Sequence, residues 1–401
     1  MPYRIPLPSL AHINMIPFNQ PYLTGKETKY IQEAVQSGQL SGNGVFTQKC
    51  QAFLEQRYGF KKVLLTTSGT HALEMAALLI NIQPGDEVIV PAYTFVSTAN
   101  AFALRGAKIV FADSNAYNPN IDVDKLEALI TPRTKALVPV HYAGIACDMD
   151  KIMALAHQYG LYVIEDAAQA IDGFYIGADG VKKALGSIGH LAAFSFHETK
   201  NIISGEGGML VINTEEFIPR SEIIWEKGTN RAAFFRGEIA KYDWIAIGSS
   251  FLPSEITAAF LWAQLENLDQ IQNRRTEIWH QYATGLQELA EKKLVKFPYL
   301  PPYATNNAHR FYLLCANPEQ RTALIAYLKQ HHIHAVFHYL SLHQSPFFQH
   351  QYGGGPLPGA DYYTYHLLRP PFFNALTPEQ ITHIITAIRN FYHTPKQKFI
   401  T

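Results

Sequence analysis

Short apolar runs alternate with helix-length segments from about residue 62, and this alternation constrains the fold most. The runs lie at residues 63–66, 87–90, 108–111, 136–140 and 161–164, with helices expected near 72–77, 97–104, 123–130 and 150–157. Strands separated by helices need crossover connections, so the pattern predicts a mainly parallel sheet. The runs are apolar throughout, as expected for strands covered by helices on both faces. Later runs at 191–194 and 209–212, joined by a Gly-rich stretch, extend the same sheet.

The character of the chain changes after about residue 250. A long helix is predicted over residues 257–278, because Leu261, Leu265 and Leu268 recur at helical spacing. Prolines at 298, 301 and 302 then break the pattern before a smaller α+β unit. We therefore expect the α/β fold class, with a large domain over residues 15–255. Residues 256–401 would form a connecting helix and a small C-terminal domain.

Composition excludes several classes of protein. The 401 residues contain 33 Lys plus Arg and 33 Asp plus Glu, a formal net charge of zero that argues against a nucleic-acid track. The three cysteines match no zinc or disulfide spacing. Histidines cluster at residues 331–338 without an acidic or cysteine partner at ligand spacing, so no metal site is expected. No signal peptide or membrane-length apolar run is seen, which favours a cytoplasmic protein.

Residues that follow the predicted strands carry the chemistry, because ligands of open α/β sheets bind beyond the carboxyl ends of the strands. Thr67-Ser68-Gly69-Thr70 comes between a strand and a helix, and Gly69 allows a close backbone approach. This segment is either a phosphate cradle at a helix N-terminus or an ordinary helix cap. Phe95 follows the next strand and could lie flat on a planar ring or simply pack.

A carboxylate and a lysine complete the pattern. Asp166 stands just after the run at 161–164, and Lys200 leaves a later strand just before the glycines at 205, 207 and 208. A lysine desolvated in the crevice loses its proton readily and can form a Schiff base. A carboxylate beside it suits a protonated pyridine nitrogen. Together they meet the minimum that pyridoxal phosphate requires of a protein.

Four motifs in this order carry a family resemblance. They are Thr67-Ser68-Gly69-Thr70, Pro91-Ala92-Tyr93-Thr94-Phe95-Val96-Ser97-Thr98, Glu165-Asp166-Ala167-Ala168-Gln169 and Phe194-Ser195-Phe196-His197-Glu198-Thr199-Lys200-Asn201. With them the chain resembles the DegT/DnrJ/EryC1/StrS sugar aminotransferases from about residue 15 to its last helix. That resemblance implies the PLP-dependent transferase fold type I of aspartate aminotransferase.

The resemblance also implies roles around the cofactor ring. Lys200 would be the Schiff-base lysine that moves protons during catalysis, and Asp166 would pair with the pyridine nitrogen. Phe95 would stack on the ring. Gln169 would approach the phenolic oxygen of the cofactor.

Further residues are implied at the cofactor phosphate. Gly69, Thr70 and Ser195 would hold this phosphate within one chain. Asn230 would reach the phosphate of the neighbouring subunit, which makes a homodimer with shared active sites the expected assembly.

The implied reaction moves an amino group from glutamate to a nucleotide-linked keto sugar. Residues 138–144, 226–231 and 335–339 resemble the subgroup that converts dTDP-4-keto-6-deoxy-D-glucose into dTDP-4-amino-4,6-dideoxy-D-galactose for lipopolysaccharide O-antigen. His338 and Asn43 would contact the sugar substrate. The alternatives are a 3-keto-sugar aminotransferase, a PLP-dependent sugar dehydratase and a PLP-binding protein without catalysis. Lys200 argues against the dehydratase, in which a histidine replaces the lysine, and together with Asp166 it argues against the last.

Overall fold

The computed structural model describes residues 15–393. Its α-helices are α1 (Glu27–Gln36), α2 (Val45–Tyr58), α3 (Gly69–Leu79), α4 (Val96–Ala103), α5 (Met149–Tyr159), α6 (Ile218–Trp225), α7 (Arg231–Phe235), α8 (Glu255–Leu265), α9 (Leu268–Glu291), α10 (Pro318–Gln330), α11 (Pro358–His366) and α12 (Pro378–His393). Its strands are β1 (Lys62–Thr66), β2 (Glu87–Pro91), β3 (Lys108–Ala112), β4 (Thr134–Leu137), β5 (Tyr162–Asp166), β6 (Phe174–Ile176), β7 (Lys182–Ala184), β8 (Leu191–Ser195), β9 (Gly208–Ile212), β10 (Val295–Lys296), β11 (Leu313–Cys315), β12 (Val336–Phe337) and β13 (Leu367–Arg369).

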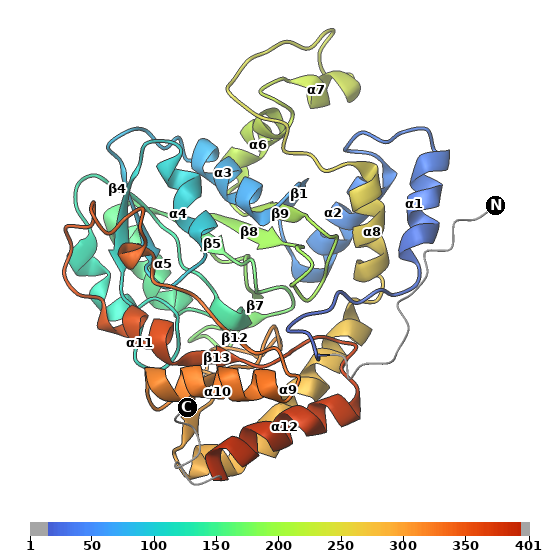
Figure 1. The fold of residues 1–401 in the computed structure, drawn as a ribbon. Coiled ribbons are helices and arrows are strands. Elements are labelled where there is room, and N and C mark those ends of the chain that lie inside the picture. The colour runs from blue at the N-terminus through green and yellow to red at the C-terminus, as the bar shows by residue number, and fades with distance from the viewer. Residues whose placement is uncertain (1–14, 394–401) are drawn as a thin grey trace.

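A seven-stranded sheet forms the centre of the molecule (Figure 1), in the order β1-β9-β8-β5-β4-β2-β3. The strands from β8 to β3 pair in parallel, and β9 runs antiparallel to both of its neighbours. Both faces of the sheet are buried. Along β1, Val63 and Leu65 belong to one apolar core and Leu64 to another. The prediction of a mainly parallel sheet with covered faces is therefore confirmed.

A second sheet lies toward the C-terminus. Its four strands are antiparallel, in the order β10-β11-β13-β12. Helices α9, α10 and α12 pack beside it at the bottom of Figure 1 and enclose a third apolar core. The division of the chain near residue 255 stays a prediction.

Two predicted helices differ from the structure. Residues 123–130 form two 3₁₀ turns, η1 (Val123–Lys125) and η2 (Glu127–Leu129), in which the N–H groups of Leu126 and Leu129 bond to carbonyls three residues back. The long helix predicted over 257–278 is broken between α8 and α9. There the Asn267 side chain donates a hydrogen bond of 2.8 Å to the carbonyl of Ala263 and competes with the continuing helix.

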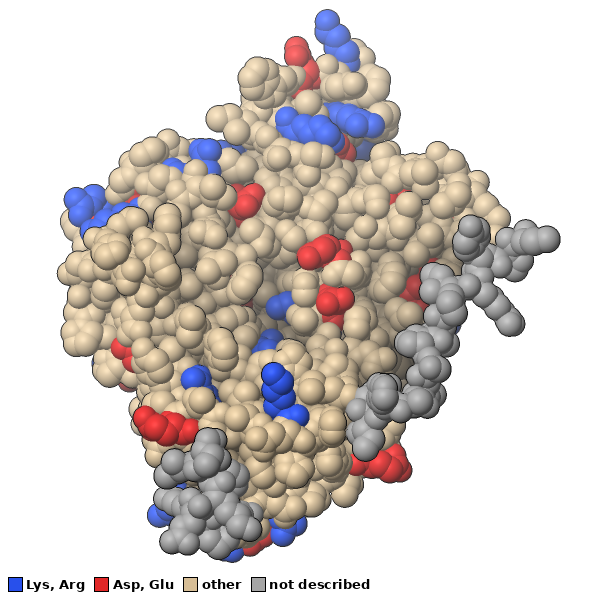
Figure 2. Space-filling model, viewed as in Figure 1, with Lys and Arg blue, Asp and Glu red and all other residues tan. Residues whose placement is uncertain are grey.

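Within residues 15–393 no helix is both long and apolar enough to cross a bilayer. On the face shown in Figure 2, lysines and arginines are scattered among acidic residues and form no continuous track. This distribution agrees with the balanced charge of the sequence.

Candidate active site

A cavity of about 600 Å³ opens at the carboxyl ends of the parallel strands. Its wall brings together most of the residues that the sequence singled out: Gly69, Thr70, Phe95, Asp166, Gln169, Ser195, Lys200 and His338. The ends of two strands position the two central groups, Asp166 and Lys200. Asp166 is the last residue of β5, and Lys200 comes shortly after Ser195, the last residue of β8. Phe95 immediately precedes α4 at the mouth and is 55% exposed.

The N-terminus of α3 forms one end of the cavity. Ser68 caps this helix by accepting a hydrogen bond of 3.1 Å from the backbone N–H of His71, and the N–H groups of Gly69 and Thr70 begin the first turn. Glycine is required at 69, since a Cβ there would lie 2.9 Å from that of Ser195. The close approach puts the serine hydroxyl beside the first turn of the helix. First-turn N–H groups lack intrahelical partners and attract anions.

Asp166 is the buried carboxylate of the cavity, with 6% of its surface exposed. Its Oδ2 accepts a hydrogen bond of 2.7 Å from Thr98 Oγ1, and its Oδ1 accepts one of 3.2 Å from the N–H of Ala168. Burial raises the pKa of Asp166, although these hydrogen bonds and the charge of Lys200 oppose the rise. A cation beside it would favour the charged carboxylate.

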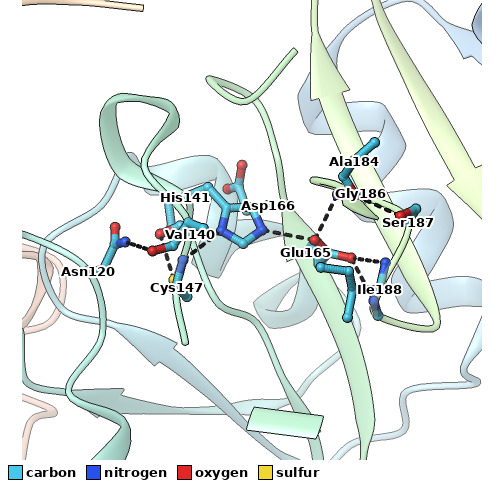
Figure 3. A network of polar contacts seen from close by, with 12 residues as sticks. Asn120, Val140, His141, Cys147, Glu165, Asp166, Ala184, Gly186, Ser187 and Ile188 are labelled. Carbon is cyan, nitrogen blue, oxygen red and sulfur yellow. Dashed lines mark hydrogen bonds and ion pairs between the residues drawn. The ribbon is translucent and has the colours of Figure 1, made fainter. Parts of the chain in front are cut away.

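A buried network of hydrogen bonds around Glu165 and His141 lies next to Asp166 (Figure 3). Glu165 Oε2 accepts hydrogen bonds from His141 Nε2 at 2.9 Å and from the N–H of Gly186 at 2.7 Å. Its Oε1 accepts from two further backbone N–H groups, those of residues 188 and 189. His141 Nδ1 accepts from the N–H of Cys147 at 3.1 Å, so the ring proton lies on Nε2 and points to Glu165. The network fixes the end of β5.

Lys200 lies in the turn after β8. Its backbone N–H donates 2.9 Å to the carbonyl of His197, and the His197 ring contacts the hydroxyl of Thr199 at 2.9 Å. Through these contacts His197 stabilises the loop that carries Lys200. Burial and the positive charge of Arg310 lower the pKa of Lys200 to about 8, while Asp166 opposes the change. A neutral amine is thus accessible near physiological pH.

The opposite wall comes from the C-terminal part of the chain. Arg310 Nη1 lies 3.2 and 3.3 Å from the two ring nitrogens of His338, one of which accepts from it, and Nη2 donates to His309 Nε2. Burial and the Arg310 charge hold the pKa values of both histidines well below the usual range. Gln169 reaches this wall, since its Nε2 donates to the hydroxyl of Tyr339 at 3.3 Å.

Two predicted residues lie outside this cavity. Asn230 begins α7, and its Oδ1 accepts a hydrogen bond of 2.8 Å from the N–H of Asp243. Asn43 has a left-handed backbone, with φ of 65°, in the loop before α2. Neither lines the cavity of its own chain. The roles expected for them stay predictions.

Thr98, Arg310 and Tyr339 line the cavity but were not singled out from the sequence. For Thr98 the sequence offers a signal, because it stands four residues after Thr94 in the second motif, a spacing that brings side chains together at a helix. In the structure the two hydroxyls lie 2.8 Å apart. Arg310 had none, and Tyr339 had only its place in the run 335–339 that resembles the subgroup. Only the return of the C-terminal sheet to the mouth of the cavity places them.

The donor set fits pyridoxal phosphate. A helix N-terminus with a nearby hydroxyl suits its phosphate, a buried carboxylate suits its ring nitrogen, and an amine of lowered pKa suits its carbonyl carbon. A metal ion has no comparable site: among the described residues no group of three or more His, Cys, Asp or Glu is close enough to hold one.

Comparisons with known proteins agree with this chemistry. The model of the DegT/DnrJ/EryC1/StrS aminotransferase family matches residues 21–389. The spore coat polysaccharide biosynthesis protein SpsC of Bacillus subtilis is 34% identical over 390 residues, covering 94% of this chain and 97% of SpsC.

Solved structures are similar over nearly the same length. DesV of S. venezuelae, in complex with a ketimine intermediate, superposes with a TM-score of 0.85 at 29% identity, covering 96% of this chain and 100% of DesV. A DegT DnrJ EryC1 StrS aminotransferase from Brucella abortus gives 0.82 at 30% identity, covering 92% and 96%. The chain belongs to the DegT/DnrJ/EryC1/StrS aminotransferase family and is a pyridoxal-phosphate-dependent sugar aminotransferase.

Proposed function

We propose that the enzyme transfers the amino group of glutamate to C4 of dTDP-4-keto-6-deoxy-D-glucose, giving dTDP-4-amino-4,6-dideoxy-D-galactose. The observation that carries the aminotransferase chemistry is the meeting of Lys200 and Asp166 in one cavity. The two side chains are close enough for each charge to act on the pKa of the other. The choice of sugar rests on the subgroup resemblance of residues 138–144, 226–231 and 335–339.

The positions of the side chains in the cavity support the cofactor contacts that the family resemblance implies. Gly69, Thr70 and Ser195 would hold the phosphate at the N-terminus of α3. Phe95, exposed at the mouth, would cover one face of the ring. Gln169 would approach the phenolic oxygen with its amide N–H, because its Oε1 already accepts a hydrogen bond of 2.7 Å from the backbone of residue 143.

Lys200 would act as the proton carrier. Bound pyridoxal phosphate supplies a carbonyl carbon that takes up the amino group and a ring that accepts the electrons of the broken C–H bond. The Lys200 amine, with a pKa of about 8, would take the proton from the substrate carbon and deliver it to the carbonyl carbon of the cofactor. Asp166 would keep a proton on the ring nitrogen, and its hydrogen bond from Thr98 holds the carboxylate toward the cavity. Donor and acceptor would react in turn at one site, which predicts ping-pong kinetics.

The cavity is of the size expected for a small-molecule site. Its volume of about 600 Å³ lies in the range of ligand sites for small molecules. His338 would contact the sugar, since it lies on the wall opposite the cofactor residues and its Nδ1 is 2.9 Å from the hydroxyl of Tyr142. A polysaccharide pathway also appears in the name of the related SpsC, which supports a sugar substrate.

We further propose a homodimer in which Asn230 completes the phosphate site of the second copy. The segment around α7 projects from the body of the molecule at the top of Figure 1. It exposes large apolar side chains: Phe235 at 68%, Trp244 at 76% and Ile247 at 65%. An apolar projecting segment of this kind is typical of a surface that a partner covers. Asn43 would contact the sugar substrate, as the family resemblance implies.

Purified enzyme loaded with pyridoxal phosphate tests the proposal. Glutamate and dTDP-4-keto-6-deoxy-D-glucose should give a 4-amino sugar of galacto configuration, identified by mass spectrometry and NMR. A Lys200→Ala variant is the matched control and should give none. If glutamate converts the cofactor spectrum but no amino sugar forms, the sugar assignment is wrong. Sugars with a keto group at C3, or linked to UDP, are then the substrates to compare.

A further inference from the structure

Arg310 is a buried cation without a buried anion to balance it. Its surface is 9% exposed, it lines the cavity, and its Nε has no hydrogen-bond partner within the described part of the chain. No carboxylate of residues 15–393 forms an ion pair with it. Arg369 lines the same cavity, is 6% exposed, and likewise leaves its Nε unpaired. Isolated buried charges are costly, so such a pair of cations is typical of a site for an anion.

The partners of Arg310 orient its guanidinium without neutralising it. His309 Nδ1 is 2.7 Å from Asn201 Oδ1, and that amide donates its own N–H groups to Gln272 Oε1 and the carbonyl of residue 307. His309 Nδ1 must therefore carry the ring proton, and Nε2 accepts from Arg310. His338 also meets the guanidinium with its ring nitrogens. Both rings have strongly lowered pKa values and stay neutral, so the full positive charge remains for a ligand.

The position of this charge selects one substrate. Arg310 and Lys200 line the same cavity, and Arg310 contacts His309, whose other ring nitrogen bonds to Asn201, the residue after Lys200. The Arg310 charge also lowers the pKa of the Lys200 amine. The anion that Arg310 binds must therefore sit near the atom that reacts. An amino acid carries its α-carboxylate one carbon from the reacting nitrogen. The diphosphate of a 4-keto sugar nucleotide is attached at C1, across the sugar ring from the keto carbon.

We propose that Arg310 binds the α-carboxylate of the amino donor, an assignment that rests on the proposed transamination. A guanidinium pairs with a carboxylate through two parallel N–H···O bonds, which positions the donor as well as holding it. Arg310 is thus a specificity residue of the first half-reaction. In the second half-reaction, in which the keto sugar takes the amino group, Arg310 acts only indirectly, through His338 and Lys200.

Three variants of the holoenzyme test the assignment. Arg310→Met removes the positive charge. Arg310→Lys keeps the charge but cannot form the two parallel hydrogen bonds. Arg389→Met is a control on the surface of α12. Calorimetric titration with 2-oxoglutarate, which binds the pyridoxal form without reacting, measures the affinity of the proposed carboxylate site. The Arg310→Met variant should bind it about 10- to 100-fold more weakly, Arg310→Lys should be intermediate, and the control should match wild type.

Single-turnover absorbance then separates the two half-reactions. Arg310→Met should need a similarly higher glutamate concentration, and its loss in the glutamate half-reaction should exceed any loss in the sugar half-reaction. Unchanged binding of 2-oxoglutarate, or a loss confined to the sugar half-reaction, overturns the proposal. If the methionine variant does not fold, wild type gives the same test: isoglutamine, in which an amide replaces the α-carboxylate, should convert the cofactor at least about tenfold less well than glutamate. Equal conversion overturns the proposal, whereas no conversion by glutamate itself contradicts the proposed function.

Discussion

Replacing Glu165 by glutamine tests whether the buried network behind Asp166 is as strong as its geometry indicates. The Glu165 carboxylate is fully buried and accepts four hydrogen bonds of 2.6 to 2.9 Å. A glutamine offers one oxygen and one amide N–H₂ group, so two of the four donors would face another donor. His141 cannot adapt by moving its proton, because its Nδ1 already accepts from the backbone of Cys147.

The expected cost follows from the two lost bonds. A hydrogen bond to a charged group contributes about 1.5 to 3 kcal/mol, so Glu165→Gln should destabilise the protein by about 3 to 6 kcal/mol. That is a large part of a typical stability of about 5 to 15 kcal/mol. Asp166 is the next residue along β5, so cofactor affinity should fall as well.

Urea unfolding at fixed protein concentration measures this loss, and a cofactor titration measures the effect on Asp166. Glu216→Gln, on an exposed turn, is the matched control and should stay within about 0.5 kcal/mol of wild type. A loss below about 1 kcal/mol for Glu165→Gln would refute the reasoning, since a single neutral hydrogen bond could account for it.

Three further predictions concern the site. Thr98→Val removes the hydroxyl that donates 2.7 Å to Asp166, and a cofactor titration should show about tenfold weaker binding. The Lys200 amine has its pKa lowered to about 8, so it is protonated below that pH. The rate at which the cofactor-free protein takes up pyridoxal phosphate, followed by absorbance, should rise about tenfold from pH 6 to 7 and level off above about pH 8; a flat profile would contradict the assigned pKa. Asn230→Ala mixed and re-associated with Lys200→Ala should recover up to about a quarter of wild-type activity, because half of the dimers would contain one complete site. No recovery would place Asn230 at the site of its own chain.

The sequence predicts the centre of the fold well because the signals there are local. Strand runs that are apolar on both faces, such as Val63-Leu64-Leu65, identify a covered parallel sheet without tertiary information. Asp166 and Lys200 could be placed in one crevice because parallel strands present their carboxyl ends at the same edge. The break between α8 and α9 was missed because it depends on one side chain, Asn267, and not on a change in periodicity.

The far wall of the cavity could not be predicted in the same way. Arg310 and Tyr339 flank strands of a sheet more than a hundred residues beyond Lys200. Arg310 belongs to no motif, and the run 335–339, which contains Tyr339, does not indicate where that side chain lies. Their place depends on how β11 and β13 pair and how that sheet returns to the mouth of the cavity. Long-range packing of this kind leaves no local trace in a sequence.

The most direct test of the central proposal is to find which lysine holds the cofactor. The protein is loaded with pyridoxal phosphate, reduced with borohydride to fix the cofactor covalently, digested and mapped by mass spectrometry. The added mass should lie on Lys200 alone and be absent from the Lys200→Ala variant, which should keep its fold by circular dichroism. A label on any other lysine, or full labelling of the variant, would contradict the assignment of this cavity as the active site.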